Sequence, residues 1–133
     1  MRYFLILIGF VIGLASPLAA QSKDIEATIG AQFDAFKADD FNRAFSYASP
    51  GIQDIFRTPE NFGRMVTNGY PMVHRPADIR FLDLHVENGA LWQRVQVRDG
   101  EGRLHMLDYQ MIQQKNGWKI NAVELVKLPH ASA

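Results

Sequence analysis

The last third of the chain alternates apolar and polar residues in four runs, which are separated by short segments rich in glycine, asparagine and aspartate. Asn88-Gly89 supplies the positive φ angles of a two-residue hairpin turn, and Gly117 suits the left-handed position that closes a three-residue turn at 115–117. A further turn is expected at residues 99–102. The pattern therefore predicts a four-stranded antiparallel meander over residues 79–128.

The predicted hairpins assign side chains to the two faces of the sheet, because a shift of one residue in register turns every side chain over. A four-residue second turn puts Val97 opposite Leu104. A three-residue third turn puts Ile112 opposite Ile120. Together the turns predict one core face, which carries Leu82, Leu84, Val86, Leu91, Val95, Val97, Leu104, Met106, Ile112, Trp118, Ile120 and Val126.

Upstream of the strands, apolar side chains recur at the spacing of one helical face. Ser22 or Asp24 can cap a first helix that ends near Asp39-Asp40. The apolar face of this helix is expected to carry Ile25, Ile29, Phe33 and Phe36.

Shorter helices and a connector are expected between the first helix and the sheet. Asp39 or Asp40 can cap a short helix, and Thr58-Pro59 can begin another. Residues 70–78 contain two prolines and are expected to form an extended connector. Helices followed by strands predict a single α+β domain over residues 21–133, with N-terminal helices packed on a curved four-stranded antiparallel sheet.

The N-terminus has the composition of a secretion signal. Arg2 precedes an apolar segment at residues 3–14, and small residues at 17–20 offer a cleavage site after Ala20. This segment is shorter than the ~20 residues that span a bilayer as a helix. Residues 1–20 are therefore expected to be a signal peptide, with an uncleaved anchor as the alternative. The processed protein is expected to be exported without a membrane anchor, to the periplasm in a Gram-negative host.

Composition excludes several classes of function. Lys and Arg number 14 and balance 14 Asp and Glu, so nothing in the net charge favours binding to nucleic acid or an anionic membrane. Cysteine is absent, which excludes disulfides, thiolate catalysis and sulfur-ligated metals. The histidines lack the spacing of zinc ligands, and no metal or cofactor is expected.

Several motifs resemble known families. DDFNRAFSYASP and the ending NGWKINAVELV, in an order of helices and then sheet, resemble the nuclear transport factor 2-like superfamily. That resemblance implies an α+β cone whose sheet wraps a long helix and leaves a pocket at its open end. PENFGRMV, YPMVHRP and NGWKI resemble more closely an exported bacterial family called domain of unknown function 4864, over about the whole chain after residue 20. This closer resemblance implies the same fold and no particular activity.

Three polar residues form a row across the predicted core face: Gln93, Asp108 and Glu124. Two facing carboxylates repel each other unless one is protonated, and burial can shift such a pKa by up to ~3–5 units. The superfamily resemblance implies a pocket carboxylate as general base, and Asp108 or Glu124 matches that role by position and chemistry. The alternative is a solvated row at the rim. The candidate ligand-pocket residues are Gln93, Gln110, Phe36 and Met106.

The opposite face of the predicted sheet is too apolar to be fully solvated. Its candidate interface residues are Trp92, Tyr109, Met111 and Val123. An apolar patch of this kind usually marks an interface, and the superfamily resemblance implies a homodimer through the sheet. Cover by the C-terminal tail or by the connector is the alternative.

These features support functions from different classes. The leading hypothesis is a non-catalytic exported module that binds a small apolar molecule in the cone or a protein partner on the sheet. The alternative is an isomerase- or lyase-like enzyme that uses Asp108 or Glu124 as general base. An accessory domain that acts only by dimerising cannot be separated from the first hypothesis by sequence.

Overall fold

The fold follows the predicted order of helices and then strands. The computed structural model describes residues 17–127. Its helices are α2 (Pro17–Lys37), α3 (Phe41–Ser46), α4 (Pro50–Phe56), α5 (Pro59–Gly69) and α6 (Pro71–His74). The strands are β1 (Pro76–Glu87), β2 (Ala90–Asp99), β3 (Leu104–Gln114) and β4 (Gly117–Val126). They form one antiparallel sheet in the order β1-β2-β3-β4, which confirms the predicted α+β class and the meander.

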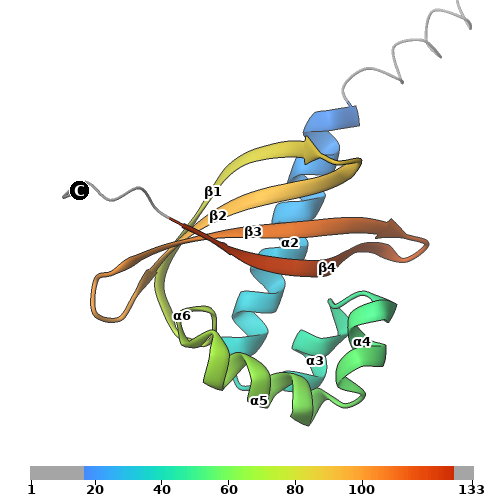
Figure 1. Cartoon of the computed structure of the whole chain (residues 1–133). Helices are drawn as coiled ribbons and strands as arrows, with labels where there is room; N and C mark the ends of the chain where they lie inside the picture. The colour runs from blue at the N-terminus through green and yellow to red at the C-terminus, as the bar shows by residue number, and fades with distance from the viewer. Residues whose placement is uncertain (1–16, 128–133) are drawn as a thin grey trace, which may run out of the picture.

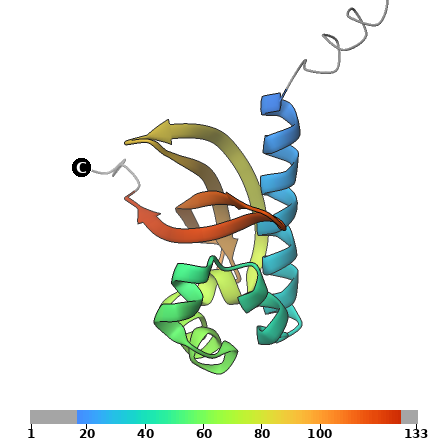
Figure 2. The same ribbon diagram turned by 90° about the vertical axis from the view of Figure 1, so that its right-hand side faces the viewer.

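The elements form a sheet with one long helix on its inner face and a group of short helices at one end. Figure 1 shows α2 behind the sheet and α3 to α6 below β4. The turned view in Figure 2 shows α2 along one side of the sheet, with the short helices at its lower end. No described helix covers the opposite face, which we call the outer face.

The apolar stripe of α2 forms the centre of the core, as its spacing predicts. Ile25, Ile29, Phe33 and Phe36 are all buried. Burial of a side chain of this size contributes about 1.5–3 kcal/mol. The helix ends at Lys37 near the predicted position, but it begins at Pro17, earlier than the predicted caps.

Short polar side chains begin the helices that follow. The side-chain oxygens of Asp40, Ser49 and Thr58 each accept a hydrogen bond from a backbone amide in the first turn of α3, α4 and α5. Ser49 also ties α4 to the sheet, because its hydroxyl donates to Asn121 Oδ1 at 2.7 Å and its amide donates to the Ile120 carbonyl at 2.8 Å. These bonds set where the short helices lie against β4.

The connector before the sheet is partly helical, which corrects the expectation of an extended segment at residues 70–78. Pro71 begins α6, where its fixed φ angle suits the first helical position. Arg75 then donates from Nη1 to the Phe36 carbonyl at 2.9 Å and from Nη2 to Asp39 Oδ2 at 3.0 Å. His74 Nε2 lies 2.7 Å from Asp39 Oδ1. We call Asp39, His74 and Arg75 the α2–α6 clamp.

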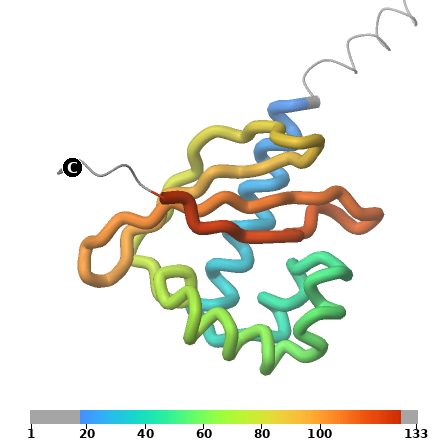
Figure 3. Tube along the Cα trace, in the orientation of Figure 1, coloured from blue at the N-terminus to red at the C-terminus, as the bar shows by residue number. Residues whose placement is uncertain are grey.

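The register of the second hairpin differs by one residue from the prediction, because the loop between β2 and β3 is one residue shorter than predicted. Figure 3 shows this loop at one end of the sheet. Val97 pairs with His105 and not with Leu104. Asp99 donates its amide to the Arg103 carbonyl, so the loop comprises residues 100–102, with Gly102 at a φ of 84°. The shorter loop turns β3 over relative to β2.

The consequence is an exchange of faces along β3. Leu107, Tyr109 and Met111 are buried against α2, whereas the prediction placed them on the outer face. Leu104 and Met106, predicted in the core, lie on the outer face with Asp108 and Gln110.

Register shifts in the β1–β2 and β3–β4 hairpins account for the other differences between the predicted and observed pairing. A register shift in β1 between Phe81 and Leu84 pairs Phe81 with Val95. In β4, Asn121 is the extra residue of a bulge, and Ile120 pairs with Met111 and not with Ile112. The third turn comprises only residues 115–116, because Gly117 pairs with Gln114. Trp118 and Ile120 are buried as predicted, while Val86 is 71% exposed.

The segment predicted as a signal peptide lies mostly outside the described residues, and residues 17–20 form the first turn of α2. Among the described helices, none is long and apolar enough to cross a membrane.

The packing of α5 on α3 predicts the effect of a glycine substitution. A Cβ atom at Gly63 would lie 2.7 Å from the Phe41 ring, so Gly63→Ala should destabilise by about 1–3 kcal/mol through overpacking. Gly69 lies in the same helix with nothing within 4 Å of a Cβ, so Gly69→Ala is the control and should be neutral or stabilising by up to ~1 kcal/mol. Urea melts of the two variants measure this difference, and equal midpoints would contradict the packing.

The α2–α6 clamp predicts a pH dependence. Hydrogen bonds from His74 and then Arg75 hold the pKa of Asp39 below its ordinary value of 3.8. A lowered carboxyl pKa adds stability above the unfolded pKa, and that stability is lost as pH falls through the folded pKa. Asp39→Asn tolerates the φ of 55° at this position and should lower the urea midpoint at pH 7.

The deficit of Asp39→Asn should shrink as pH falls below about 3.8. Asp34→Asn is the matched control, because the exposed Asp34 side chain forms no ion pair with another described residue. A deficit that does not change between pH 7 and the acid limit would show that the clamp does not stabilise the fold through its charge.

Candidate functional site

An apolar cavity lies between the helices and the inner face of β3 and β4. Its volume is about 320 Å³, at the lower end of the ~300–1,000 Å³ range of small-molecule sites. Residues of α2, α4, α5 and α6 form one side, and residues of β3 and β4 form the other. We call this space the helix–sheet cavity.

Apolar side chains form most of the wall of the helix–sheet cavity. Phe36, Phe56 and Phe62 supply aromatic surface, and their rings pack on one another, with centroids 5.9 Å apart for Phe36 and Phe62 and 5.7 Å apart for Phe56 and Phe62. Ile55 also lines the cavity and is 68% exposed, so it lies at the mouth. No charged side chain lines the part of the wall that the structure describes.

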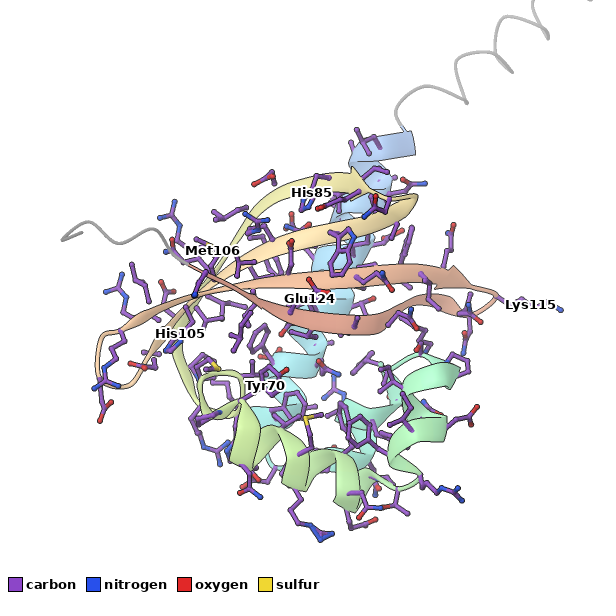
Figure 4. The ribbon with its side chains drawn as sticks, viewed as in Figure 1. Tyr70, His85, His105, Met106, Lys115 and Glu124 are labelled. Atoms are coloured by element: carbon purple, nitrogen blue, oxygen red, sulfur yellow. The ribbon has the colours of Figure 1, made fainter. Side chains whose placement is uncertain are left out.

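The polar side chains in the wall are Gln32, Tyr70 and Tyr109. Gln32 is buried on α2, and its Nε2 donates to the Ala44 carbonyl at 3.1 Å. Figure 4 shows Tyr70 between the sheet and α5. Tyr109 lies on β3, with its ring centroid 6.2 Å from that of Phe33.

The phenol of Tyr109 has a perturbed acidity. Burial raises the pKa of Tyr109 well above its ordinary value, and the neighbouring Tyr70 phenol adds to the shift. The hydroxyl therefore stays protonated at physiological pH and can act as a hydrogen-bond donor.

The predicted catalytic carboxylates are neighbours, but they do not line the helix–sheet cavity. Asp108 pairs with Glu124 across β3 and β4, as predicted. The register places both on the outer face. Glu124 is exposed there (Figure 4). Asp108 is 6% exposed and is held by Arg94, whose Nη2 and Nε lie 3.0 and 3.2 Å from its two carboxylate oxygens.

Arg94 changes the electrostatics of this pair. Its guanidinium neutralises Asp108, and the hydrogen bonds to Asp108 raise the pKa of Arg94. His85 Nε2 lies 3.6 Å from Asp108 Oδ2. The two-point contact between Arg94 and Asp108 is of the type that forms the stronger ion pairs in proteins. Among the described residues, no three potential metal ligands are grouped into a site.

The predicted pocket residues fall in different places. Phe36 lines the helix–sheet cavity. Gln93 is fully buried on the inner face, and its Nε2 donates at 2.9 Å to the Leu82 carbonyl, at the irregular part of β1. Gln110 and Met106 lie on the outer face, where Gln110 Oε1 accepts from Asn121 Nδ2 at 2.7 Å. The one-residue shift in register accounts for these differences.

The predicted interface residues are divided between the two faces. Trp92 lies half-buried on the outer face, opposite His85 and Gln110. Tyr109, Met111 and Val123 lie on the inner face, which corrects their predicted position. Tyr109 and Val123 also line the helix–sheet cavity.

Comparison with known families matches the model described as Domain of unknown function (DUF4864) to residues 18–133. The chain belongs to the DUF4864 family. No curated protein and no solved structure matches this DUF4864 chain. The match covers all the elements that form the cavity, so the cavity belongs to the family domain.

The sequence pattern of this DUF4864 domain did not predict Gln32 or Tyr70 as site residues, and it predicted Tyr109 only as an interface residue. Gln32 had a recognisable signal, because it interrupts the apolar stripe of α2 between Ile29 and Phe36. A buried polar residue on such a stripe requires a partner, here the Ala44 carbonyl. Tyr70 had no comparable signal, since its position depends on how α5 and α6 meet.

The contact between Asp108 and Arg94 predicts the effect of removing one charge in this DUF4864 domain. Asp108→Asn leaves a partly buried guanidinium without its charged partner, which should destabilise by about 1–3 kcal/mol. If repulsion between Asp108 and Glu124 outweighed the attraction between Asp108 and Arg94, Asp108→Asn would instead be more stable than the parent. Glu124→Gln is the control and should change stability by less than about 0.5 kcal/mol, because Glu124 is exposed. Equilibrium unfolding of the variants at pH 7 distinguishes the two outcomes.

Proposed function

We propose that this chain is an exported, non-catalytic binding module that holds a small apolar molecule in the helix–sheet cavity. The observation that carries the proposal is the cavity itself, with a volume of about 320 Å³ and a wall without charged side chains among the described residues. Transfer of apolar surface from water into such a space is favourable in proportion to the area buried, at about 25 cal/mol per Å².

The accessibility of the cavity supports a ligand that exchanges with solvent. Ile55 is exposed at the mouth, and half-buried residues such as Ile52 and Met65 line the wall nearby. Large apolar side chains that are left partly exposed around a concave surface are typical of binding sites. The apolar segment at residues 3–14 supports export, and an exported protein would meet its ligand outside the cytoplasm.

We further infer that this protein is a member of the nuclear transport factor 2-like superfamily. The order of a long helix, short helices and an antiparallel meander supports this assignment. A cavity between the helices and the inner face of the sheet is also what the resemblance in sequence implies.

The alternative of an isomerase- or lyase-like enzyme has less support. A general base must lie within hydrogen-bond reach of the proton that it removes. Asp108 and Glu124 lie on the outer face, away from the cavity, and Asp108 is engaged by Arg94. A homodimer or a protein partner on the outer face stays a prediction, for which half-buried Trp92 is the remaining candidate residue.

Binding of a neutral fluorescent dye tests the proposed function. N-phenylnaphthylamine is small, apolar and brighter in apolar surroundings, so the purified protein should give a saturable increase in fluorescence. Met65→Trp places a larger side chain in the wall of the cavity and should weaken dye binding at least tenfold, on the order of 1.4 kcal/mol.

Val86→Trp is the matched control, because Val86 is 71% exposed on the β1–β2 hairpin and does not line the cavity. This variant should bind the dye as the parent does. Absence of saturable binding by the parent, or equal binding by both variants, would contradict a ligand site in the helix–sheet cavity.

A further inference from the structure

The hydroxyl of Tyr109 in the helix–sheet cavity has no hydrogen-bond partner within the described structure. Tyr109 is only 1% exposed, yet its hydroxyl makes no hydrogen bond with another described residue. Among the described side chains, His85 Nδ1 and Gln93 Oε1 are fully enclosed without a partner, whereas the Tyr109 hydroxyl is not fully enclosed. Because Tyr109 lines the cavity, its hydroxyl has access to the space inside.

A buried hydroxyl without a partner lowers the stability of the folded protein. Removing such a group from water costs free energy that a hydrogen bond normally offsets. A phenylalanine at position 109 would fill the same space without that cost. Packing alone therefore does not require the hydroxyl of Tyr109, and a ligand that accepts its hydrogen bond would supply a partner inside the cavity.

Gln32 adds a second fixed polar group to the same wall. Its Nε2 must be the atom that faces the Ala44 carbonyl, because only the amide nitrogen can donate there. This orientation leaves Oε1 as the acceptor end of the side chain, and no described residue donates to it. The wall therefore offers a ligand a donor from β3 and an acceptor from α2, beside the phenol of Tyr70.

We infer that the ligand of the helix–sheet cavity is an uncharged molecule with an apolar body and an oxygen that accepts a hydrogen bond from Tyr109. This inference rests on the proposed function. A carbonyl oxygen satisfies the Tyr109 donor, and a hydroxyl can in addition donate to Gln32. A carboxylate or an ammonium group would be desolvated in a wall that offers no opposite charge among its described residues.

Displacement of N-phenylnaphthylamine by two molecules of equal carbon number tests the charge of the ligand. Methyl octyl ketone carries a neutral carbonyl, and decanoate carries a charge at pH 8. The ketone should displace the dye at a concentration at least tenfold lower than decanoate does.

Tyr109→Phe tests the role of the hydroxyl. This variant should bind the ketone about three- to tenfold more weakly than the parent, as expected for one lost hydrogen bond. It should bind the dye, which has no oxygen acceptor, within about twofold of the parent. Without ligand, it should melt at the same temperature as the parent or higher, which a structural role of the hydroxyl would not produce.

Tyr47→Phe is the matched control, because the Tyr47 hydroxyl contacts Arg43 Nε at 3.3 Å and does not line the cavity. It should bind ketone and dye as the parent does. Decanoate binding as tight as the ketone would overturn the neutral ligand. Unchanged ketone binding in Tyr109→Phe, or a lower melting temperature, would overturn the role of Tyr109. In those cases the dye still binds and the proposed function stands, whereas failure of the parent to bind the dye overturns both.

Discussion

The side chain of Asp99 sets the register on which the rest of the core depends. Its Oδ1 accepts hydrogen bonds from the amides of Glu101 and Arg103, each at 2.9 Å, and its Oδ2 lies 2.9 Å from His105 Nε2. These bonds close the loop at residues 100–102 and hold the pKa of Asp99 below its ordinary value, chiefly through His105. Because side chains alternate along a strand, this loop directs Tyr109 towards α2 and Asp108 away from it. The wall of the cavity and the ion pair on the outer face both follow from that one turn.

The sequence was most informative where the pattern is local. The burial of Ile25, Ile29, Phe33 and Phe36 follows from helical spacing, and the caps at Asp40 and Thr58 follow from short-range hydrogen bonding. The hairpin at Asn88-Gly89 follows from its positive φ angles of 53° and 78°. Each of these features depends only on residues a few positions apart in the chain.

The faces of β3 could not be predicted with the same reliability, because apolar residues occupy both of its sides. Leu104 and Met106 lie on one face, and Leu107 and Met111 lie on the other, so alternation does not select between two loop lengths. The predicted pairing of Asp108 with Glu124 is observed although the third turn is one residue shorter than predicted, because the bulge at Asn121 restores the predicted register beyond it. The resemblance implied a pocket, and Phe36 does line the cavity, but most of its wall could not be predicted because it depends on how α4, α5 and α6 lie against the sheet.

The bonds between Ser49 and β4 have a consequence for how the sheet ends. β4 is an edge strand, and an edge strand offers unpaired backbone groups to strands of other chains. Residues 47–49 pair with the first half of that edge, where the Ser49 amide donates to the Ile120 carbonyl and the Ile120 amide donates to the Tyr47 carbonyl at 2.9 Å. The other edge, β1, begins with a proline and carries Asp78, Arg80, Asp83 and Glu87. Both edges of the sheet are thus partly blocked against the addition of a foreign strand, which disfavours growth into a continuous β-aggregate.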